Sequence, residues 1–507
     1  MKTLINGAWV VGYENSQHNL HRNFQVVYEG NRIIYVGPRF EGKPDEIIEA
    51  PEALVSPGFI DTHVHSGYRA LHRLLSDVGR PDLYGQPFLE ASVPRRGTKI
   101  RGFPNWVSAE EAAGENTLDL HAVFTVSELL RNGVTTFVEL GSGVVVQDAI
   151  WRECERLGVR AYLGPGYDSG RWVGGKDGRI ERVLDEEGGA QLFRQAVQFI
   201  ERTVEHGGDL IRGMLVPREV ESCTVDLLRR TAAAARELRV PMGTHAAYNV
   251  LEFYETVRQY RMTPIEVLEK VGMLCPQLNI GHGNFISDSP RLNYSGARDL
   301  ELMGKHQVSI SHCPINIIRR ARVLDSWEKY RKAGVNITIG SDTYPRDMIM
   351  NLRSASYHGK VMGRNLKAAS AAEVFSAATL GGARSLDRDD LGRLAVGAKA
   401  DIIIVDLTGN GTLRYGPVRD PIRSLVECGV GDDVDTVIVN GVVRMRNRQI
   451  PGVHLDEIRC AAQSVAEDLW SRVQEWDPLL RTADERCPLS FCPEASSYPL
   501  IDEMSGE

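Results

Sequence analysis

The feature that most constrains the fold is a pattern that repeats between residues 57 and 390. Short apolar runs rich in β-branched residues alternate with segments of helical periodicity. Several runs end in a histidine or an aspartate; they cover residues 58–65, 240–245, 278–282, 308–312 and 335–342. Repeated βα units with polar groups at the carboxyl ends of the strands are typical of the (β/α)8 barrel. The sequence therefore predicts an α/β protein with a TIM barrel over residues 57–390.

The two ends of the chain show a different pattern, of short strands separated by turns. An apolar run at 24–28 stops at the turn 29–32, and a second run resumes at 33–36, which predicts a hairpin. Similar runs return at 400–406 and 434–441. We expect residues 1–56 and 391–453 to pair into one small β-sandwich. Residues 454–507 are expected to be a C-terminal tail, helical to about 482 and then extended.

Composition excludes several classes of protein. The net charge of −8 argues against a nucleic-acid binder, which is usually basic. We find no apolar run of about 18 residues and no signal-peptide pattern, so we expect no membrane association and a cytoplasmic location. The eight cysteines are dispersed, which is typical of reduced thiols.

Five side chains at the strand ends have the chemistry of a metal site. His63 and His65 are two residues apart on one strand, so their imidazoles point the same way. His245, His282 and Asp342 each end a later strand. Imidazoles with one carboxylate suit zinc or ferrous iron, and such an ion lowers the pKa of bound water to around 7. Asp342 can bind the ion and take the proton of the water, and His282 can hydrogen-bond the hydroxide or the substrate oxygen.

These motifs resemble the amidohydrolase superfamily, in particular its branch of atrazine chlorohydrolases and cytosine deaminases. The resemblance lies in the motifs at 57–65, 244–245, 281–283, 311–314, 340–343 and 397–402, so it spans nearly the whole chain. It implies a single metal ion, zinc before iron, held by His63, His65, His245 and Asp342, with His282 beside the reactive water. It also implies a homodimer or a higher homo-oligomer.

Two departures from that branch affect the expected reaction. Its deaminases and triazine hydrolases carry His-x-x-Glu after the fifth strand, where the glutamate shuttles protons, but this chain has Tyr248 at that position. A tyrosine with an ordinary pKa near 10 cannot shuttle protons as a carboxylate does, although it can donate a hydrogen bond to an oxyanion. Glu252, one helical turn further on, is an alternative. Binuclear relatives bridge two metals with a lysine or a glutamate; the fourth-strand segment 211–217 has no lysine, and Glu139 and Glu219 are the only bridge candidates we consider, so we favour one metal.

Other residues are candidates for contact with substrate. They are His72, Trp106, His312, Asn316 and Arg346. His72 and Trp106 belong to an irregular insertion at 66–117, whose length is typical of a lid or a binding loop. For Arg346 and its neighbour Asp347, we favour a salt bridge with each other over a role in the pocket.

The first hypothesis is a metal-dependent amidohydrolase that cleaves a C–N bond in a small amide, urea or carbamate-like compound, with Asp342, His282 and Tyr248 as catalytic residues. The first alternative is an aminohydrolase or a dechlorinase of an s-triazine or another aminoheterocycle. The second alternative is a non-catalytic binding protein with a barrel fold.

Overall fold

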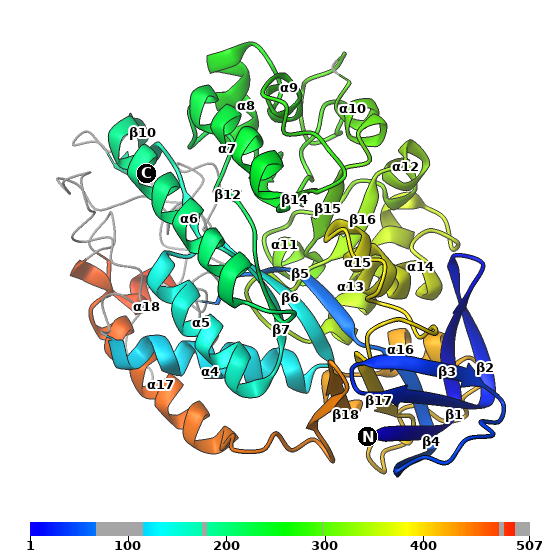
Figure 1. Cartoon of the computed structure of the whole chain (residues 1–507). Helices are drawn as coiled ribbons and strands as arrows, with labels where there is room; N and C mark the ends of the chain where they lie inside the picture. The colour runs from blue at the N-terminus through cyan, green and yellow to red at the C-terminus, as the bar shows by residue number, and fades with distance from the viewer. Residues whose placement is uncertain (67–114, 175–179, 297, 476–480, 492–507) are drawn as a thin grey trace.

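The computed structural model of the chain describes residues 1–66, 115–174, 180–296, 298–475 and 481–491. Helices and parallel strands alternate through its centre, and a separate β-sheet built from both ends of the chain lies beside them (Figure 1). The insertion predicted at 66–117 lies for the most part outside the described residues, and so do His72 and Trp106.

The β-sheet has seven strands, and it joins segments from both ends of the chain. In spatial order they are β19 (Val442–Met445), β18 (Val434–Val439), β17 (Ile402–Asp406), β4 (Glu46–Pro57), β1 (Lys2–Glu14), β2 (Gln17–Glu29) and β3 (Arg32–Gly37). The pairing of β17 with β4 connects the two chain ends, as the sequence predicts. The predicted hairpin is β2 and β3, which turns at Gly30 with a left-handed φ of 58°. Ile5, Val55 and Ile402 belong to the buried apolar cluster of this sheet.

The centre of the molecule contains eight short parallel strands. They are β5 (Phe59–Val64), β6 (Val134–Leu140), β7 (Arg160–Gly164), β11 (Ile211–Gly213), β13 (Met242–Ala246), β14 (Leu278–His282), β15 (Ser309–His312) and β16 (Asn336–Ile339). They form two four-stranded sheets, one ordered β11-β7-β6-β5 and the other β13-β14-β15-β16. Parallel bridges from Leu215 to Met242 and from Val64 to Asp342 join the edges of the two sheets. We call these eight strands the strand ring. All but one of their residues are buried, which is typical of parallel strands covered by helices.

Helices follow the ring strands and cover them from outside (Figure 1). They are α4 (Glu115–Arg131), α5 (Val144–Leu157), α6 (Glu186–His206), α7 (Val225–Leu238), α8 (Val250–Tyr260), α9 (Pro264–Lys270), α10 (Asp299–Lys305), α11 (Pro314–Ile318), α12 (Trp327–Ala333), α13 (Met348–Gly363), α14 (Ala371–Ser376) and α15 (Gly382–Ser385). Helix α7 begins with a side-chain cap, because the Thr224 side chain accepts a hydrogen bond from the Leu227 amide at 3.3 Å. A π-helical turn, η2 (Ala377–Gly381), separates α14 from α15.

Smaller elements complete the described chain. They are the short strands β8 (Gly166–Tyr167), β9 (Gly170–Gly174), β10 (Ile180–Leu184) and β12 (Val216–Pro217), the helices α16 (Pro421–Cys428), α17 (Leu455–Ser471) and α18 (Ala483–Arg486), and the turns η3 (Gly431–Asp433) and η4 (Val473–Glu475). Helix α17 lies within the segment predicted to be helical and packs against α4. The cysteines in the described segments are free thiols. In those segments we find no helix that is long and apolar enough to cross a membrane.

Candidate metal centre and active site

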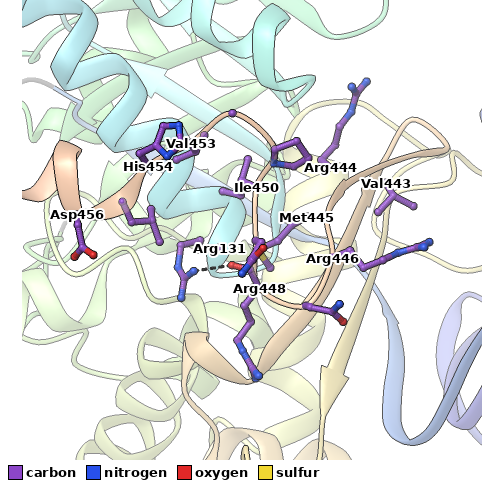
Figure 2. A pocket seen from close by; sticks show the side chains of 15 residues that line it. Arg131, Val443, Arg444, Met445, Arg446, Arg448, Ile450, Val453, His454 and Asp456 are labelled. Atoms are coloured by element: carbon purple, nitrogen blue, oxygen red, sulfur yellow. Dashed lines mark hydrogen bonds between the residues drawn. The ribbon is translucent and has the colours of Figure 1, made fainter.

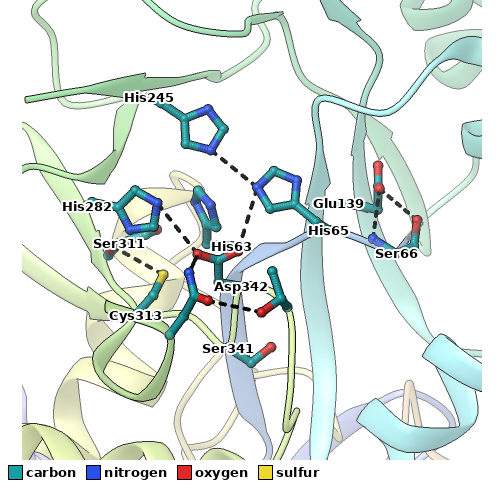
Figure 3. A network of polar contacts seen from close by, with 12 residues as sticks. His63, His65, Ser66, Glu139, His245, His282, Ser311, Cys313, Ser341 and Asp342 are labelled. Atoms are coloured by element: carbon teal, nitrogen blue, oxygen red, sulfur yellow. Dashed lines mark hydrogen bonds and ion pairs between the residues drawn. The ribbon is translucent and has the colours of Figure 1, made fainter. Parts of the chain in front are cut away.

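The five predicted side chains come together at one edge of the strand ring. His63 lies in β5 and His65 one residue beyond it, His245 lies in β13, His282 ends β14, and Asp342 follows β16. The carboxyl ends of parallel strands meet at the same edge, and Figure 3 shows the side chains pointing toward one another there. Ligand atoms of His63, His245 and His282 lie within 4.8 Å of one another, and so do those of His63, His65 and Asp342.

The two closest imidazoles have the spacing of ligands to a common ion. Nε2 of His65 lies 3.2 Å from Nε2 of His245. Two nitrogens bound tetrahedrally at about 2.0–2.1 Å would be about 3.3 Å apart. Nδ1 of His245 lies 2.8 Å from the carbonyl of Arg218, which can only accept, so this nitrogen donates and Nε2 of the neutral ring keeps its lone pair. A cation held by His65 and His245 would satisfy that lone pair.

The other imidazoles also suit a cation. Nε2 of His63 is buried and has no hydrogen-bond partner among the described residues. Burial, followed by the neighbouring imidazoles, holds the pKa values of His63, His65 and His282 well below their ordinary value. The rings are therefore neutral at pH 7, as metal ligands must be. The donor set fits a divalent ion of the zinc or iron class.

The backbone between β5 and β16 brings Asp342 to the histidines. The Asp342 amide donates to the carbonyl of His63 at 2.7 Å, and the His65 amide donates to the carbonyl of Asp342 at 2.8 Å. Asp342 and His282 have left-handed φ values of 61° and 74°. Such a backbone conformation is costly for a residue with a side chain and clusters at functional sites.

Asp61 connects the ends of β5 and β16 next to the metal centre. Its carboxylate accepts hydrogen bonds from the hydroxyl and the amide of Ser341 and from the amide of His63. Burial raises the pKa of Asp61 to about 6. Asp61 therefore acts as a buried link between the ends of β5 and β16, a role that sequence reasoning did not assign.

The carboxylate of Asp342 has further neighbours. Asn316 donates a hydrogen bond to Oδ2, and Nε2 of His282 lies 3.6 Å from the same oxygen. Cys313 also lies within 4.8 Å of His282 and Asp342, which the sequence did not indicate. Asn316, predicted as a substrate contact, thus reaches the centre through Asp342.

His312 and Arg346 are buried beside the site. The His312 ring lies 6.2 Å from the ring of Trp327, and burial, with the charge of His358, lowers its pKa to about 3. Arg346 donates to the carbonyl of His65 at 2.6 Å and forms a salt bridge with Glu128 on α4 at 3.0 Å.

The prediction of a salt bridge between Arg346 and Asp347 is wrong. Asp347 instead accepts hydrogen bonds from the amides of Met350 and Gly431. It therefore caps the first turn of α13 and holds η3.

Tyr248, which stands where the resemblance implies a proton-shuttling glutamate, has a carboxylate partner. The hydroxyl of Tyr248 donates to Oε1 of Glu221 at 2.6 Å. Glu252 accepts from the amides of Ala247 and Tyr248 at 3.0 and 3.2 Å, so both of its oxygens serve the main chain. Sequence reasoning missed Glu221; the only available signal was its place shortly after the fourth-strand segment 211–217.

The two carboxylates considered as metal bridges have protein partners. Glu139 accepts from Ser142 at 2.6 Å, from Ser66 at 2.8 Å and from Gln147, and Figure 3 shows it apart from the imidazoles. Glu219 accepts from Ser222 at 2.7 Å. Each of these carboxylates is thus hydrogen-bonded to neighbouring side chains.

Two arginines near the centre were also missed. Burial lowers the pKa of Arg320 to about 10 and that of Arg322 to about 9, and their mutual repulsion contributes to the lower value of Arg322. Both lower the pKa of His282, so both are electrostatically coupled to the site.

A pocket of about 780 Å³ lies elsewhere, beside the end of α4 (Figure 2). Arg131 lines it and binds both Asp432 and the carbonyl of Arg448 at 2.8 Å, while Arg446 pairs with Glu46 at 2.9 Å. Its described lining includes none of the candidate metal ligands, so we do not associate it with the chemistry.

Comparisons with known proteins agree with this geometry. The profile of the amidohydrolase family matches residues 54–444. A 5-methylthioadenosine/S-adenosylhomocysteine deaminase from Pyrococcus abyssi (strain GE5 / Orsay) is 26% identical over 442 residues, which cover 85% of this chain and 92% of the relative.

Two solved structures with zinc are similar in fold. An adenosine deaminase from Xanthomonas campestris has a TM-score of 0.75 at 21% identity, covering 92% of this chain and 98% of that one. Atrazine chlorohydrolase TrzN from Arthrobacter aurescens TC1 has a TM-score of 0.74 at 22% identity, covering 92% and 100%. Since the family profile covers most of the chain and the predicted ligands converge, the chain belongs to the amidohydrolase family.

Proposed function

We propose that this protein is a metal-dependent hydrolase that cleaves a C–N bond in a small amide, urea or carbamate-like compound. The observation that carries the proposal is the convergence of four ligands, His63, His65, His245 and Asp342, with His282 beside them. One divalent ion, zinc before iron, fits this set. When bound, such an ion supplies Lewis acidity and an activated water at neutral pH.

The side chains around the centre have the remaining catalytic and positioning roles. Asp342 is the base that accepts the proton of the attacking water, because it is the carboxylate of this centre and lies within 4 Å of both His65 and His282. Asn316 holds Oδ2 of Asp342 in place. His282 or Tyr248 donates to the oxygen of the substrate carbonyl, on which negative charge develops. The leaving amine receives a proton as the C–N bond breaks.

An aminohydrolase or dechlorinase of an aminoheterocycle is the second candidate. It is supported by the names of similar proteins, a deaminase of 5-methylthioadenosine and S-adenosylhomocysteine and an atrazine chlorohydrolase. Against it stands Tyr248, three residues after His245, where a proton-shuttling carboxylate would be expected. We place the non-catalytic alternative last, because all the ligand side chains are present and converge.

We also propose the finer architecture and the assembly. The strand ring is a (β/α)8 barrel over residues 57–390, and residues 1–56 with 391–453 form a small β-sandwich, followed by the tail 454–507. His72, Trp106, His312, Asn316 and Arg346 contribute to the substrate pocket. The protein is a cytoplasmic homodimer or higher homo-oligomer that acts on a small molecule.

The function is tested by metal analysis and a substrate panel. Purified protein should contain one equivalent of zinc or iron and should release amine from anilides or phenylureas in a chelator-sensitive reaction. Efficient release of ammonia from a ring amidine would favour the second candidate instead. No activity on any of these compounds, with or without added metal, would contradict both.

The ligand set is tested by His245→Asn. We expect metal content to fall to a small fraction of an equivalent and activity to fall by more than about 100-fold, because even changes in residues that support ligands cost 10–100-fold. His206→Asn, an exposed histidine at the end of α6, is the matched control and should retain both. Full metal content in His245→Asn would exclude this histidine as a ligand.

A further inference from the structure

A hydrogen-bonded pair of side chains lies next to the candidate metal centre. The hydroxyl of Tyr248 is 2.6 Å from Oε1 of Glu221, and the Tyr248 ring centroid is 5.9 Å from that of His245. Glu221 belongs to the loop after β12, which a bridge between Glu219 and His245 aligns with β13. Side chains from two neighbouring loops of the strand ring thus meet beside one of the proposed ligands.

The main chain of Tyr248 is held on both sides. Its amide donates to Glu252 at 3.2 Å, and its carbonyl accepts from Arg322 Nη1 at 3.2 Å. Ala247, just before it, has a left-handed φ of 50°. Because the backbone is fixed, the tyrosine hydroxyl has a defined position relative to His245, as a group that donates to a substrate needs.

Glu221 is an unusual partner for a tyrosine. It is 1% exposed, and its second oxygen, Oε2, has no hydrogen-bond partner among the described residues. Burial, with the nearby charge of Glu219, raises the pKa of Glu221 to about 8. Because a carboxyl group that keeps its proton can donate, the 2.6 Å contact can reverse so that Glu221 donates to the phenolic oxygen, which leaves the hydrogen of Tyr248 for a third group.

We propose that Glu221 and Tyr248 form a proton-donating pair that protonates the leaving nitrogen. The inference rests on the proposed function, in which a C–N bond breaks at this centre. As that bond breaks, the Tyr248 O–H proton moves to the nitrogen, and the Glu221 O–H proton moves to the phenolic oxygen. Tyr248 ends neutral and Glu221 ends as a carboxylate. The proton that Asp342 takes from the attacking water balances this loss, and exchange with solvent restores both groups. Tyr248 is thus a catalytic residue, and Glu221 acts through it.

The test is a series of amides or phenylureas whose leaving amines differ in basicity. Tyr248→Phe should lower kcat by roughly 10²–10⁴-fold for basic alkylamine leaving groups, since that is the usual contribution of a general acid. For 4-nitroaniline, which leaves with little protonation, the loss should be less than about tenfold. Glu221→Gln should show the same trend with smaller losses, and KM should change little in either variant. A purely structural role would lower all members of the series alike.

Matched controls come from α8. Tyr254→Phe and Glu255→Gln change the same residue types. Tyr254 is 38% exposed, and Glu255 forms a salt bridge with Arg258. Both should keep the activity of the wild type across the series. Metal content and the midpoint of thermal unfolding should match the wild type in all four variants.

The outcomes separate the inference from the function on which it rests. If the wild type hydrolyses the series and Tyr248→Phe loses nothing, or loses activity equally for all leaving groups, the pair is not the proton donor. If the wild type releases ammonia from aminoheterocycles instead, the amide function is wrong, and the same variants must lose that activity for the pair to stand. If it does neither, infrared difference spectra of the metal-loaded protein still decide the pair: the band of a protonated carboxyl must disappear in Glu221→Gln and shift in Tyr248→Phe.

Discussion

Gly281 shows how little space the imidazoles leave at the centre. A Cβ at this position would lie 2.6 Å from Cε1 of His63 and 3.0 Å from Cδ2 of His245. Gly340 is similar, since its Cβ would lie 2.6 Å from Cβ of His63. A residue with a side chain at either position would displace a proposed ligand, so glycine is required here by packing.

We therefore predict that Gly281→Ala weakens metal binding and destabilises the fold by about 1–3 kcal/mol, the usual cost of overpacking. Competition with a chromophoric chelator measures metal affinity, and denaturant unfolding measures the stability of the fold. Gly143→Ala is the control, because a Cβ there meets nothing within 4 Å and φ is −67°. Unchanged metal affinity in Gly281→Ala would mean that the imidazoles relax more easily than the packing suggests.

Single residues also show the limits of the sequence. The pattern of His63 and His65 on one strand predicts two imidazoles on one side, because strand geometry is local. The partner of Tyr248 lies 27 residues earlier in the chain and was not predicted. Local periodicity contains no information on which side chain from another loop will reach a given hydroxyl.

At the scale of elements, the junction between β5 and β16, which we call the seam, joins the two four-stranded sheets of the ring. Only one backbone bridge, between Val64 and Asp342, joins these strands in the described chain. Arg346 reinforces the seam, because it contacts the His65 carbonyl and Glu128 on α4. The guanidinium is completely buried, so its removal leaves unmet partners.

We predict that Arg346→Met destabilises the protein by roughly 2–4 kcal/mol, somewhat less than the loss of a fully buried pair because Glu128 is partly exposed. It should also speed up metal dissociation, since His65 loses its support. Arg353→Met removes comparable hydrogen bonds, from α13 to the carbonyls of Val426 and Gly429, away from the seam. That control should lower stability but leave the rate of metal loss unchanged. Equal rates in both variants would mean that Arg346 does not support the ligand.

On the scale of the whole molecule, buried polar side chains join the seven-stranded sheet to the strand ring and to the helical segment that follows it. Arg160 on β7 is fully buried and contacts Asp401, next to β17, at 3.2 Å. His18, at the start of β2, contacts Thr379 in η2 at 2.9 Å and lies 5.4 Å from the ring of Phe375. The sheet thus contacts the strand ring through Arg160 and the α14–η2 segment through His18.

The lowered pKa of His18 predicts that the stability of the folded protein depends on pH. Burial, with a contribution from Arg393, lowers its pKa to about 4, whereas the unfolded chain has the ordinary value near 6.5. As pH falls below 6.5, the unfolded state binds the proton first, so stability is lost until about pH 4, on the order of 2–3 kcal/mol. His18→Gln should lose less stability over this range than the wild type, measured by denaturant unfolding at several pH values. His21→Gln, which removes a histidine stacked on Phe24, should behave like the wild type. Parallel curves for wild type and His18→Gln would contradict the assignment.

The sequence by itself determined the chemistry and order of the proposed metal ligands and the alternation of helices and strands. Those properties follow from local rules: the two-residue repeat of strands, helical periodicity and turn residues. Only the tertiary structure decided that Glu221 binds Tyr248, that Glu252 serves the main chain, and that Arg346 pairs with Glu128 and leaves Asp347 to cap a helix. These contacts join segments that packing and strand register bring together, and a one-dimensional pattern does not encode where loops from different strands meet.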